Sequence, residues 1–166
     1  SLGVVDVVVK AQVLSGKRGK NNGIRFCASS EEVVQAVTDL FSIEILDQYV
    51  ASVRIEKKLH IAEEQYMSIT YDTNKKQPVL VYSKEGGVDI EDVLEKKIVT
   101  HHLNILEADV VFDTYFPQDS ELAKIAQKLW HCFLEEDCRL VEINPLVKTA
   151  DGEWIAADAK IAIDED

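Results

Sequence analysis

The chain has 166 residues, of which 30 are acidic and 18 basic, giving a formal net charge of −12. A surface this acidic repels nucleic acids and anionic membranes, so neither is expected as a partner. Hydrophobic residues form 46% of the chain but only in short runs, which indicates one folded domain or two small lobes without a membrane span. We expect a cytoplasmic protein, or a mitochondrial matrix protein if the source is a eukaryote.

The first part of the chain predicts two strands and a helix. Residues 4–14 are apolar and β-branched, as in a strand, and lead into a basic, glycine-containing loop. A short strand is expected at residues 24–27. Ser29 and Glu32 then form a capping box, which predicts a helix starting at residue 30. Its expected apolar face consists of Val33, Val34, Val37, Leu40 and Phe41.

The middle of the chain predicts three strands, at residues 50–57, 64–72 and 77–83. Asn74 lies between the last two, which favours a hairpin. The Glu-Gly-Gly segment at residues 85–87 breaks the strand pattern and must be a loop.

The last part predicts one amphipathic helix at residues 120–136, capped by Asp119 or Ser120. Two strands, at residues 140–148 and 153–163, close the chain. Many strands with only two convincing helices indicate an α+β fold rather than a doubly wound parallel sheet.

The basic loop after the first strand is one candidate site. Its glycines allow backbone N–H groups to approach a phosphate closely. The positive charges on or beside it are Lys10, Lys17, Arg18 and Lys20. Judged on this pattern alone, an ordinary basic surface loop remains the alternative.

The closing hairpin is the second candidate. If its loop is residues 150–152, Thr149 pairs with Glu153, and counting back sets Asn144 opposite Asp158 on one face. Amide and carboxylate oxygens are ligands that Mg²⁺ accepts.

Two alternatives to this metal site stay open. A two-residue turn would set Asp158 opposite Pro145, on the other face, and leave no shared site. The face could also be a solvated polar surface on which Glu142 pairs with Lys160.

The remaining polar residues predict no catalytic group. The four His lack metal-ligand spacing, and His101 and His102 are expected in a solvated loop. Cys27, Cys132 and Cys138 include no CxxC pair, so each is expected to be a free thiol in a reducing compartment.

Four short motifs, in this order, resemble the β subunits of ADP-forming succinate–CoA ligases. They lie at residues 9–20, 85–91 (Glu-Gly-Gly-Val-Asp-Ile-Glu), 142–147 (Glu-Ile-Asn-Pro-Leu-Val) and 158–160. The resemblance covers nearly the whole chain. It implies an α+β ATP-grasp fold, with antiparallel sheets and flanking helices in a small lobe of about residues 1–50 and a larger lobe of about residues 51–166.

The resemblance also implies site residues, motif by motif. The implied nucleotide contacts are Lys10, Lys17, Arg18, Gly19, Glu56 and Glu64, and the implied Mg²⁺ ligands are Asn144 and Asp158. Two positions depart from the family pattern. Lys17 stands where the family often has Gly, which stiffens the loop but adds a charge. Leu59 stands where a nucleotide-binding Thr is common, so we expect that contact to be absent.

The implied function is binding of ATP or GTP with Mg²⁺ for phosphoryl transfer to a histidine of a partner α subunit, in a ligase of the tricarboxylic acid cycle. CoA and the acid would be bound by parts outside this chain, which we expect to be a piece of a longer protein, truncated at both ends and inactive alone. A citrate– or malate–CoA ligase, an ATP-citrate lyase relative and a non-catalytic nucleotide-binding module are the alternatives.

Overall fold

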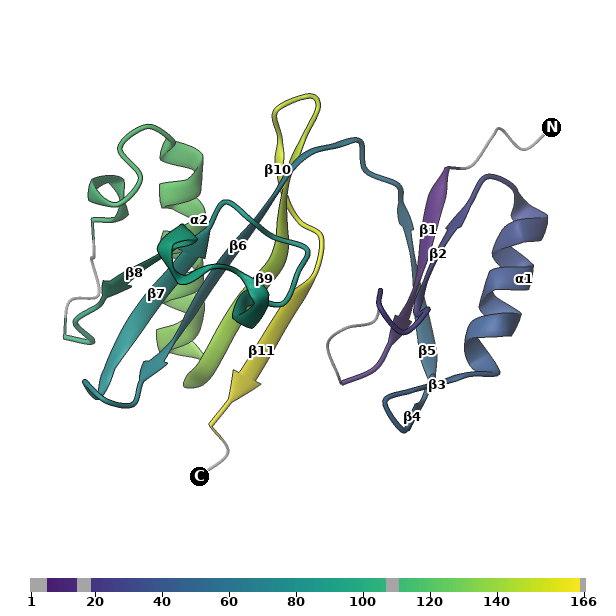
Figure 1. Ribbon diagram of the computed structural model, residues 1–166, viewed down its shortest axis with the longest axis horizontal. Helices are drawn as coiled ribbons and strands as arrows, with labels where there is room; N and C mark the ends of the chain where they lie inside the picture. The colour runs from purple at the N-terminus through teal and green to yellow at the C-terminus, as the bar shows by residue number, and fades with distance from the viewer. Residues whose placement is uncertain (1–5, 15–18, 107–110, 165–166) are drawn as a thin grey trace. The chain divides into compact units, whose positions relative to one another are not determined.

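The computed structural model describes residues 6–14, 19–106 and 111–164 (Figure 1). The chain divides into two compact units, residues 1–59 and 60–166. Each unit is an antiparallel sheet with one α-helix packed on it, so the expected α+β class is confirmed. The expected lobe boundary was near residue 50, whereas β5 (Ser52–Lys57) pairs along the whole of β1 (Val7–Gln12) and belongs to the first unit.

The first unit is built on a three-stranded sheet with the order β2-β1-β5. β2 (Ile24–Cys27) occupies the predicted residues. Val9 and Ala11 of β1 are fully buried and pack with α1 (Ser30–Phe41), whereas Lys10, between them, points to the opposite face. Alternation along β1 therefore separates a core face from a face that carries charge.

Helix α1 begins where the capping box predicts. Ser29 Oγ accepts a hydrogen bond from the Glu32 backbone N–H at 3.2 Å. The expected apolar face is wrong in part, because Val34 and Phe41 are 67% and 48% exposed. The buried stripe runs instead through Ala36 and Leu40, four residues apart, while Val34 and Phe41, seven apart, share the outer side of the helix.

A two-stranded hairpin that the sequence did not predict follows α1. It joins β3 (Glu44–Ile45) to β4 (Gln48–Tyr49). Leu46 and Asp47 form its turn, both with positive φ, as a tight hairpin turn requires. The buried Ile45 ties this hairpin to the core of the first unit.

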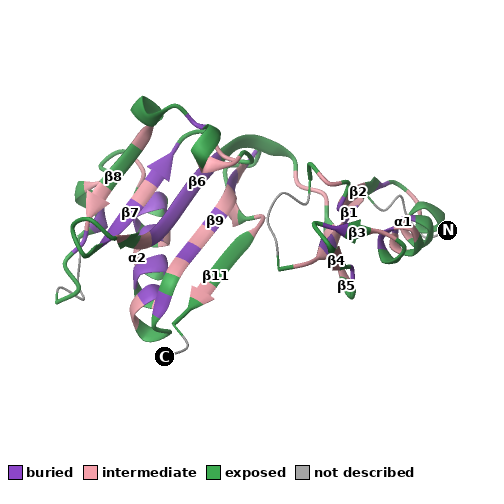
Figure 2. Ribbon diagram, turned by 60° about the horizontal axis from the view of Figure 1, so that its bottom comes forward, coloured by how far each residue is buried: buried purple, intermediate pink, exposed green. Residues whose placement is uncertain are grey.

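The second unit is a six-stranded sheet with the order β10-β9-β6-β7-β8, in which β11 also pairs with β9. The strands are β6 (Ile61–Asp72), β7 (Gln77–Ser83), β8 (Ile98–His102), β9 (Cys138–Thr149), β10 (Trp154–Ala156) and β11 (Ala159–Ile163). The predicted hairpin joins β6 and β7, with Asp72 Oδ1 accepting from the Asn74 backbone N–H at 2.9 Å. Buried residues run along β6, β7 and β9, whereas β11 is mostly exposed (Figure 2).

Helix α2 (Ser120–Glu135) covers one face of this sheet, as Figure 1 shows. Asp119 caps it by accepting from the backbone N–H groups of Glu121 and Leu122. Its buried residues are Leu122, Ala123, Ala126, Leu129, Trp130 and Phe133. Within the described ranges, no helix is long and apolar enough to cross a membrane.

The described part of the segment between β7 and α2 contains three short 3₁₀ helices, η1 (Ile90–Asp92), η2 (Glu95–Lys97) and η3 (Phe112–Thr114), and the strand β8. The expectation of a solvated loop at His101 and His102 is therefore wrong. Pairing with β7 places both side chains against neighbours.

These two contacts differ in kind. The His101 ring stacks on Tyr115 at 4.2 Å between centroids, and burial lowers the pKa of His101. His102 Nε2 lies 2.8 Å from Asp72 Oδ2, and this hydrogen bond lowers the pKa of Asp72. Both contacts fix the edge strand to the rest of the unit.

Candidate functional site

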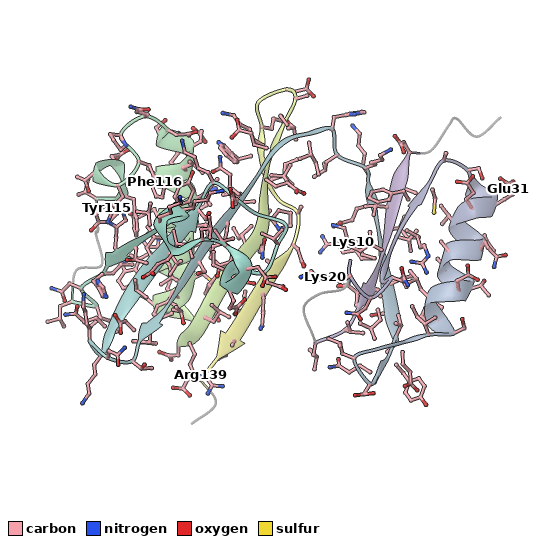
Figure 3. The ribbon with its side chains drawn as sticks, viewed as in Figure 1. Lys10, Lys20, Glu31, Tyr115, Phe116 and Arg139 are labelled. Atoms are coloured by element: carbon pink, nitrogen blue, oxygen red, sulfur yellow. The ribbon has the colours of Figure 1, made fainter. Side chains whose placement is uncertain are left out.

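The charged face of the first unit centres on Lys10. Figure 3 shows its side chain leaving β1 on the side away from α1. The Lys10 ammonium lies 2.6 Å from Glu56 Oε2, and Arg54 Nε lies 2.7 Å from Glu56 Oε1. The Lys10 side chain is only 16% exposed. The register of β5 on β1 sets Arg54 opposite Lys10, and Glu56 opposite Val8, two residues before Lys10. Lys10 and Glu56, two of the predicted nucleotide contacts, are thus brought together.

This arrangement suits an anionic ligand with polar hydroxyls. A partly buried ammonium makes charge-assisted bonds to phosphate oxygens, and Glu56 holds it in place from the next strand. Phe26, across β1 from Glu56, is 68% exposed on the same face. Lys17 and Arg18 of the predicted phosphate loop lie outside the described residues, and Gly19 lies in the turn that leads to β2.

The closing hairpin of the second unit has the predicted three-residue loop. The Thr149 N–H donates to the Glu153 carbonyl at 2.9 Å, and Gly152 adopts a φ of +86°, in the left-handed region. β10 and β11 pair with β9 in one continuous register, which sets Asn144 opposite Asp158. The Asn144 N–H donates to the Asp158 carbonyl at 3.1 Å. The expected register is thereby confirmed, and the two-residue turn is excluded.

The Asn144 side chain also binds backbone. Its Oδ1 accepts from the Gly87 N–H at 2.8 Å, and its Nδ2 donates to the Val88 carbonyl at 2.9 Å. Residues 84–88, here called the glycine loop, are therefore attached to β9. This contact could not be predicted from the sequence, because Asn144 and Gly87 lie 57 positions apart.

The glycine loop rests on β6 on its other side. The Gly86 N–H donates to the Glu64 carbonyl at 2.9 Å. A Cβ atom on Gly86 would lie 2.6 Å from the Gln65 backbone nitrogen and closer still to its carbonyl group, so only glycine fits there. The Glu64 carboxylate lies beside Gly87.

A cavity of about 450 Å³ opens between β6 and the glycine loop. Its lining residues are Ile61, Ala62, Glu63, Glu64, Lys84, Glu85, Gly86 and Val88. Glu64, a predicted nucleotide contact, is one of them. The cavity has an apolar edge and charged walls, which suits a small polar ligand.

A buried polar chain supports one wall of this cavity. The Tyr82 hydroxyl donates to Gln65 Oε1 at 2.7 Å, and Gln65 Nε2 donates to Glu63 Oε2 at 2.9 Å. Gln65 is only 4% exposed, so both of its side-chain bonds are needed to satisfy it. Burial, with the nearby charges of Asp119 and Glu63, raises the pKa of Tyr82 to about 12, which keeps the hydroxyl a donor.

A second buried hydroxyl holds Glu142, the acidic neighbour of Asn144 on this face. Tyr66 donates to Glu142 Oε2 at 2.8 Å and is hydrogen-bonded to Ser68 Oγ at 3.0 Å. Burial raises the pKa of Tyr66 well above its ordinary value; the Ser68 bond opposes this rise and the Glu142 charge adds to it. Sequence reasoning missed both tyrosines, since a Tyr in a strand pattern is typical of plain core.

Asn144 and Asp158 carry oxygen atoms of the kinds that a divalent cation accepts. The Asn144 carbonyl oxygen accepts one hydrogen bond, from the Gly87 N–H, and an amide oxygen has two lone pairs. Among the described residues, no three His, Cys, Asp or Glu side chains gather as a metal-binding group. Two oxygen ligands match Mg²⁺, which usually takes the rest of its octahedron from water and substrate phosphates.

Residues 1–148 match the family model of the ATP-grasp domain. The chain belongs to the ATP-grasp family. The match covers the first unit and most of the second, and ends within β9, so β10 and β11 lie beyond it. The resemblance drawn from the four motifs is thereby confirmed at the level of fold.

The chain is also similar to curated succinate–CoA ligase [ADP-forming] β subunits. It is 41% identical over 174 residues to that of Methanocaldococcus jannaschii, an alignment covering 97% of this chain and 48% of the relative. It is 42% identical over 173 residues to that of Methanothermobacter thermautotrophicus, an alignment covering 97% of this chain and 47% of the relative. The chain thus spans about half the length of these relatives.

Solved structures with the same fold are more distant in sequence. An ATP citrate lyase from Methanothrix soehngenii, in complex with citrate and coenzyme A, gives a TM-score of 0.76 at 22% identity, over 97% of this chain and 39% of that one. A dinucleotide-forming acetyl-coenzyme A synthetase from Ca. Korarchaeum cryptofilum gives a TM-score of 0.68 at 18% identity, over 95% of this chain and 76% of that one. At these identities the likeness shows the fold alone.

Proposed function

We propose that this chain is the part of a succinate-type acyl-CoA ligase that binds a Mg²⁺–nucleoside triphosphate. The observation that carries the proposal is the strand register that sets Asn144 opposite Asp158. Asn144 also binds the glycine loop, which forms one wall of the cavity lined by Glu64, here called the Glu64 cavity. Oxygen ligands for a cation and a cavity for a polar ligand thus meet in one unit. The ATP-grasp family and the similarity to ADP-forming ligases support ATP as the nucleotide, with GTP as the other choice.

Each proposed contact has a physical role. Lys10, held by Glu56, neutralises phosphate oxygens, with help from Lys17, Arg18 and Gly19. Glu56 accepts hydrogen bonds at the purine and ribose end, and Glu64 is a further nucleotide contact. These groups position the triphosphate without covalent chemistry of their own.

The metal adds charge neutralisation. Asn144 and Asp158 would hold Mg²⁺, which when bound offsets the charge that develops on the phosphoryl oxygens during transfer. The phosphoryl acceptor is proposed to be a histidine on a partner α subunit, and CoA and succinate are proposed to bind to parts outside this chain. The name of the relatives, which states ADP formation and a β subunit, supports this reading.

Asp158→Asn tests the metal role. The substitution keeps the shape of the side chain but removes its charge, so Mg²⁺–ATP affinity should fall about tenfold, as for weakened metal shells generally. Affinity for ATP in the presence of EDTA should stay nearly constant. Isothermal titration of both proteins, with and without Mg²⁺, measures the two quantities. Equal Mg²⁺–ATP affinities would assign Asp158 to a solvated sheet face.

A further inference from the structure

The two hydrogen bonds of Asn144 define the orientation of its amide. Oδ1 faces an N–H group and Nδ2 faces a carbonyl group, so a flipped amide would oppose donor to donor and acceptor to acceptor. Asn144 pairs with Gly87 and Val88 much as a strand residue pairs with its neighbour. A residue that serves only as a metal ligand would not need this second pairing.

The glycine loop is held from two sides. Gly86 sits directly on the backbone of β6, where its N–H binds the Glu64 carbonyl. The next residue, Gly87, is held by β9 through Asn144. Between them these contacts fix the position of the loop, which supplies four of the eight residues that line the cavity.

We propose that Asn144 is a positioning residue: its side-chain amide fastens the glycine loop and thereby sets the wall of the Glu64 cavity, independently of any bond to Mg²⁺. The proposal rests on the proposed function only where the cavity is taken to receive part of the nucleotide. In that case Asn144 would serve both the loop and the cation.

Amide exchange at Gly87, measured by NMR, tests the fastening directly. Asn144→Ala removes the acceptor, so the Gly87 N–H should exchange roughly fivefold faster or more, as expected for one or two lost hydrogen bonds. Asn144→Asp restores an acceptor and should recover the protection. Asp158→Asn is the matched control: it changes the other proposed ligand and should leave Gly87 exchange unchanged.

An internal reference guards against general unfolding. Leu80, fully buried in the middle of β7, should keep its slow exchange in all three variants. If Asn144→Ala also accelerates amide exchange at Leu80, Gly87 exchange is judged in the Asn144→Asp protein, which changes only one atom of the side chain. Gly87 exchange equal to wild type in Asn144→Ala would overturn the proposal.

Binding of ADP without Mg²⁺ separates the two roles of Asn144. A metal ligand matters only when the metal is present, so a purely metal-binding Asn144 predicts unchanged metal-free affinity in Asn144→Ala. A loop fastening predicts weaker metal-free affinity in Asn144→Ala and unchanged affinity in Asp158→Asn. If wild type binds no ADP at all, the proposed function fails while Gly87 exchange still decides the fastening.

Discussion

Replacing Gly86 with Ala is expected to lower the free energy of unfolding by about 3 kcal/mol or more, at the upper end of overpacking costs. The added Cβ would meet the backbone of Gln65, with its nitrogen at 2.6 Å and its carbonyl group closer still. Backbone atoms within a paired strand cannot rotate away as the end of a flexible side chain can. The loop must therefore leave β6, or the strand must shift. Urea unfolding followed by circular dichroism measures the loss.

Gly19→Ala is the matched control for this substitution. Among the residues that the structure describes, a Cβ on Gly19 would meet Ile24 Cδ1 alone, at the ordinary contact distance of 3.8 Å. Its unfolding midpoint should lie close to that of wild type. A Gly86→Ala protein as stable as the Gly19→Ala protein would show that the glycine loop is not seated on β6 as described.

Lys10→Ala is expected to weaken nucleotide binding roughly 10- to 150-fold, because a charge-assisted bond to phosphate contributes about 1.5–3 kcal/mol. The protein should still fold, because the Lys10 side chain lies on the face of β1 away from α1 and the core, and because Arg54 still pairs with Glu56. Calorimetric titration with Mg²⁺–ATP gives the two affinities.

Lys124→Ala is a suitable control, because Lys124 also forms an ion pair at 2.6 Å, with Glu121. Its side chain is 64% exposed on α2, and Lys124 is not one of the proposed contacts. It should bind the nucleotide as wild type does. If Lys10→Ala behaves like Lys124→Ala, Lys10 is a structural partner of Glu56 and has no phosphate role.

Local chemistry accounts for the parts of the fold that the sequence predicted. The capping box at Ser29 and Glu32 is a pattern of neighbouring residues, and it placed the start of α1 correctly. The closing hairpin was predictable for the same reason. A three-residue loop ending in Gly152 fixes the register, and the register carries Asn144 to Asp158 by counting alone.

Contacts between distant segments could not be predicted in this way. The residues around Gly86 do not predict its contact with β6, and those around Asn144 do not predict its hydrogen bond with Gly87. The strand at His101 and His102 depends on pairing with β7, which overrides the polar character of the two residues. Val34 and Phe41 were misplaced because the sheet contacts the side of α1 centred on Ala36.

The site shows the same division. Residue types and motifs indicated which side chains to consider, and Lys10 with Glu56 and Asn144 with Asp158 are brought together as pairs. Their supports, Tyr82 through Gln65 and the glycine loop through Asn144, arise from packing across the sheet. Those supports give the cavity its walls.

Titration of the wild-type chain with ATP, with Mg²⁺ and with EDTA, tests the central claim most directly. A Mg²⁺–nucleotide site on this chain predicts saturable binding of one ATP per chain, clearly tighter with Mg²⁺ than without it. Folding of the same sample is verified by circular dichroism. Absence of saturable binding by the folded chain, or binding of equal strength with and without Mg²⁺, would contradict the account.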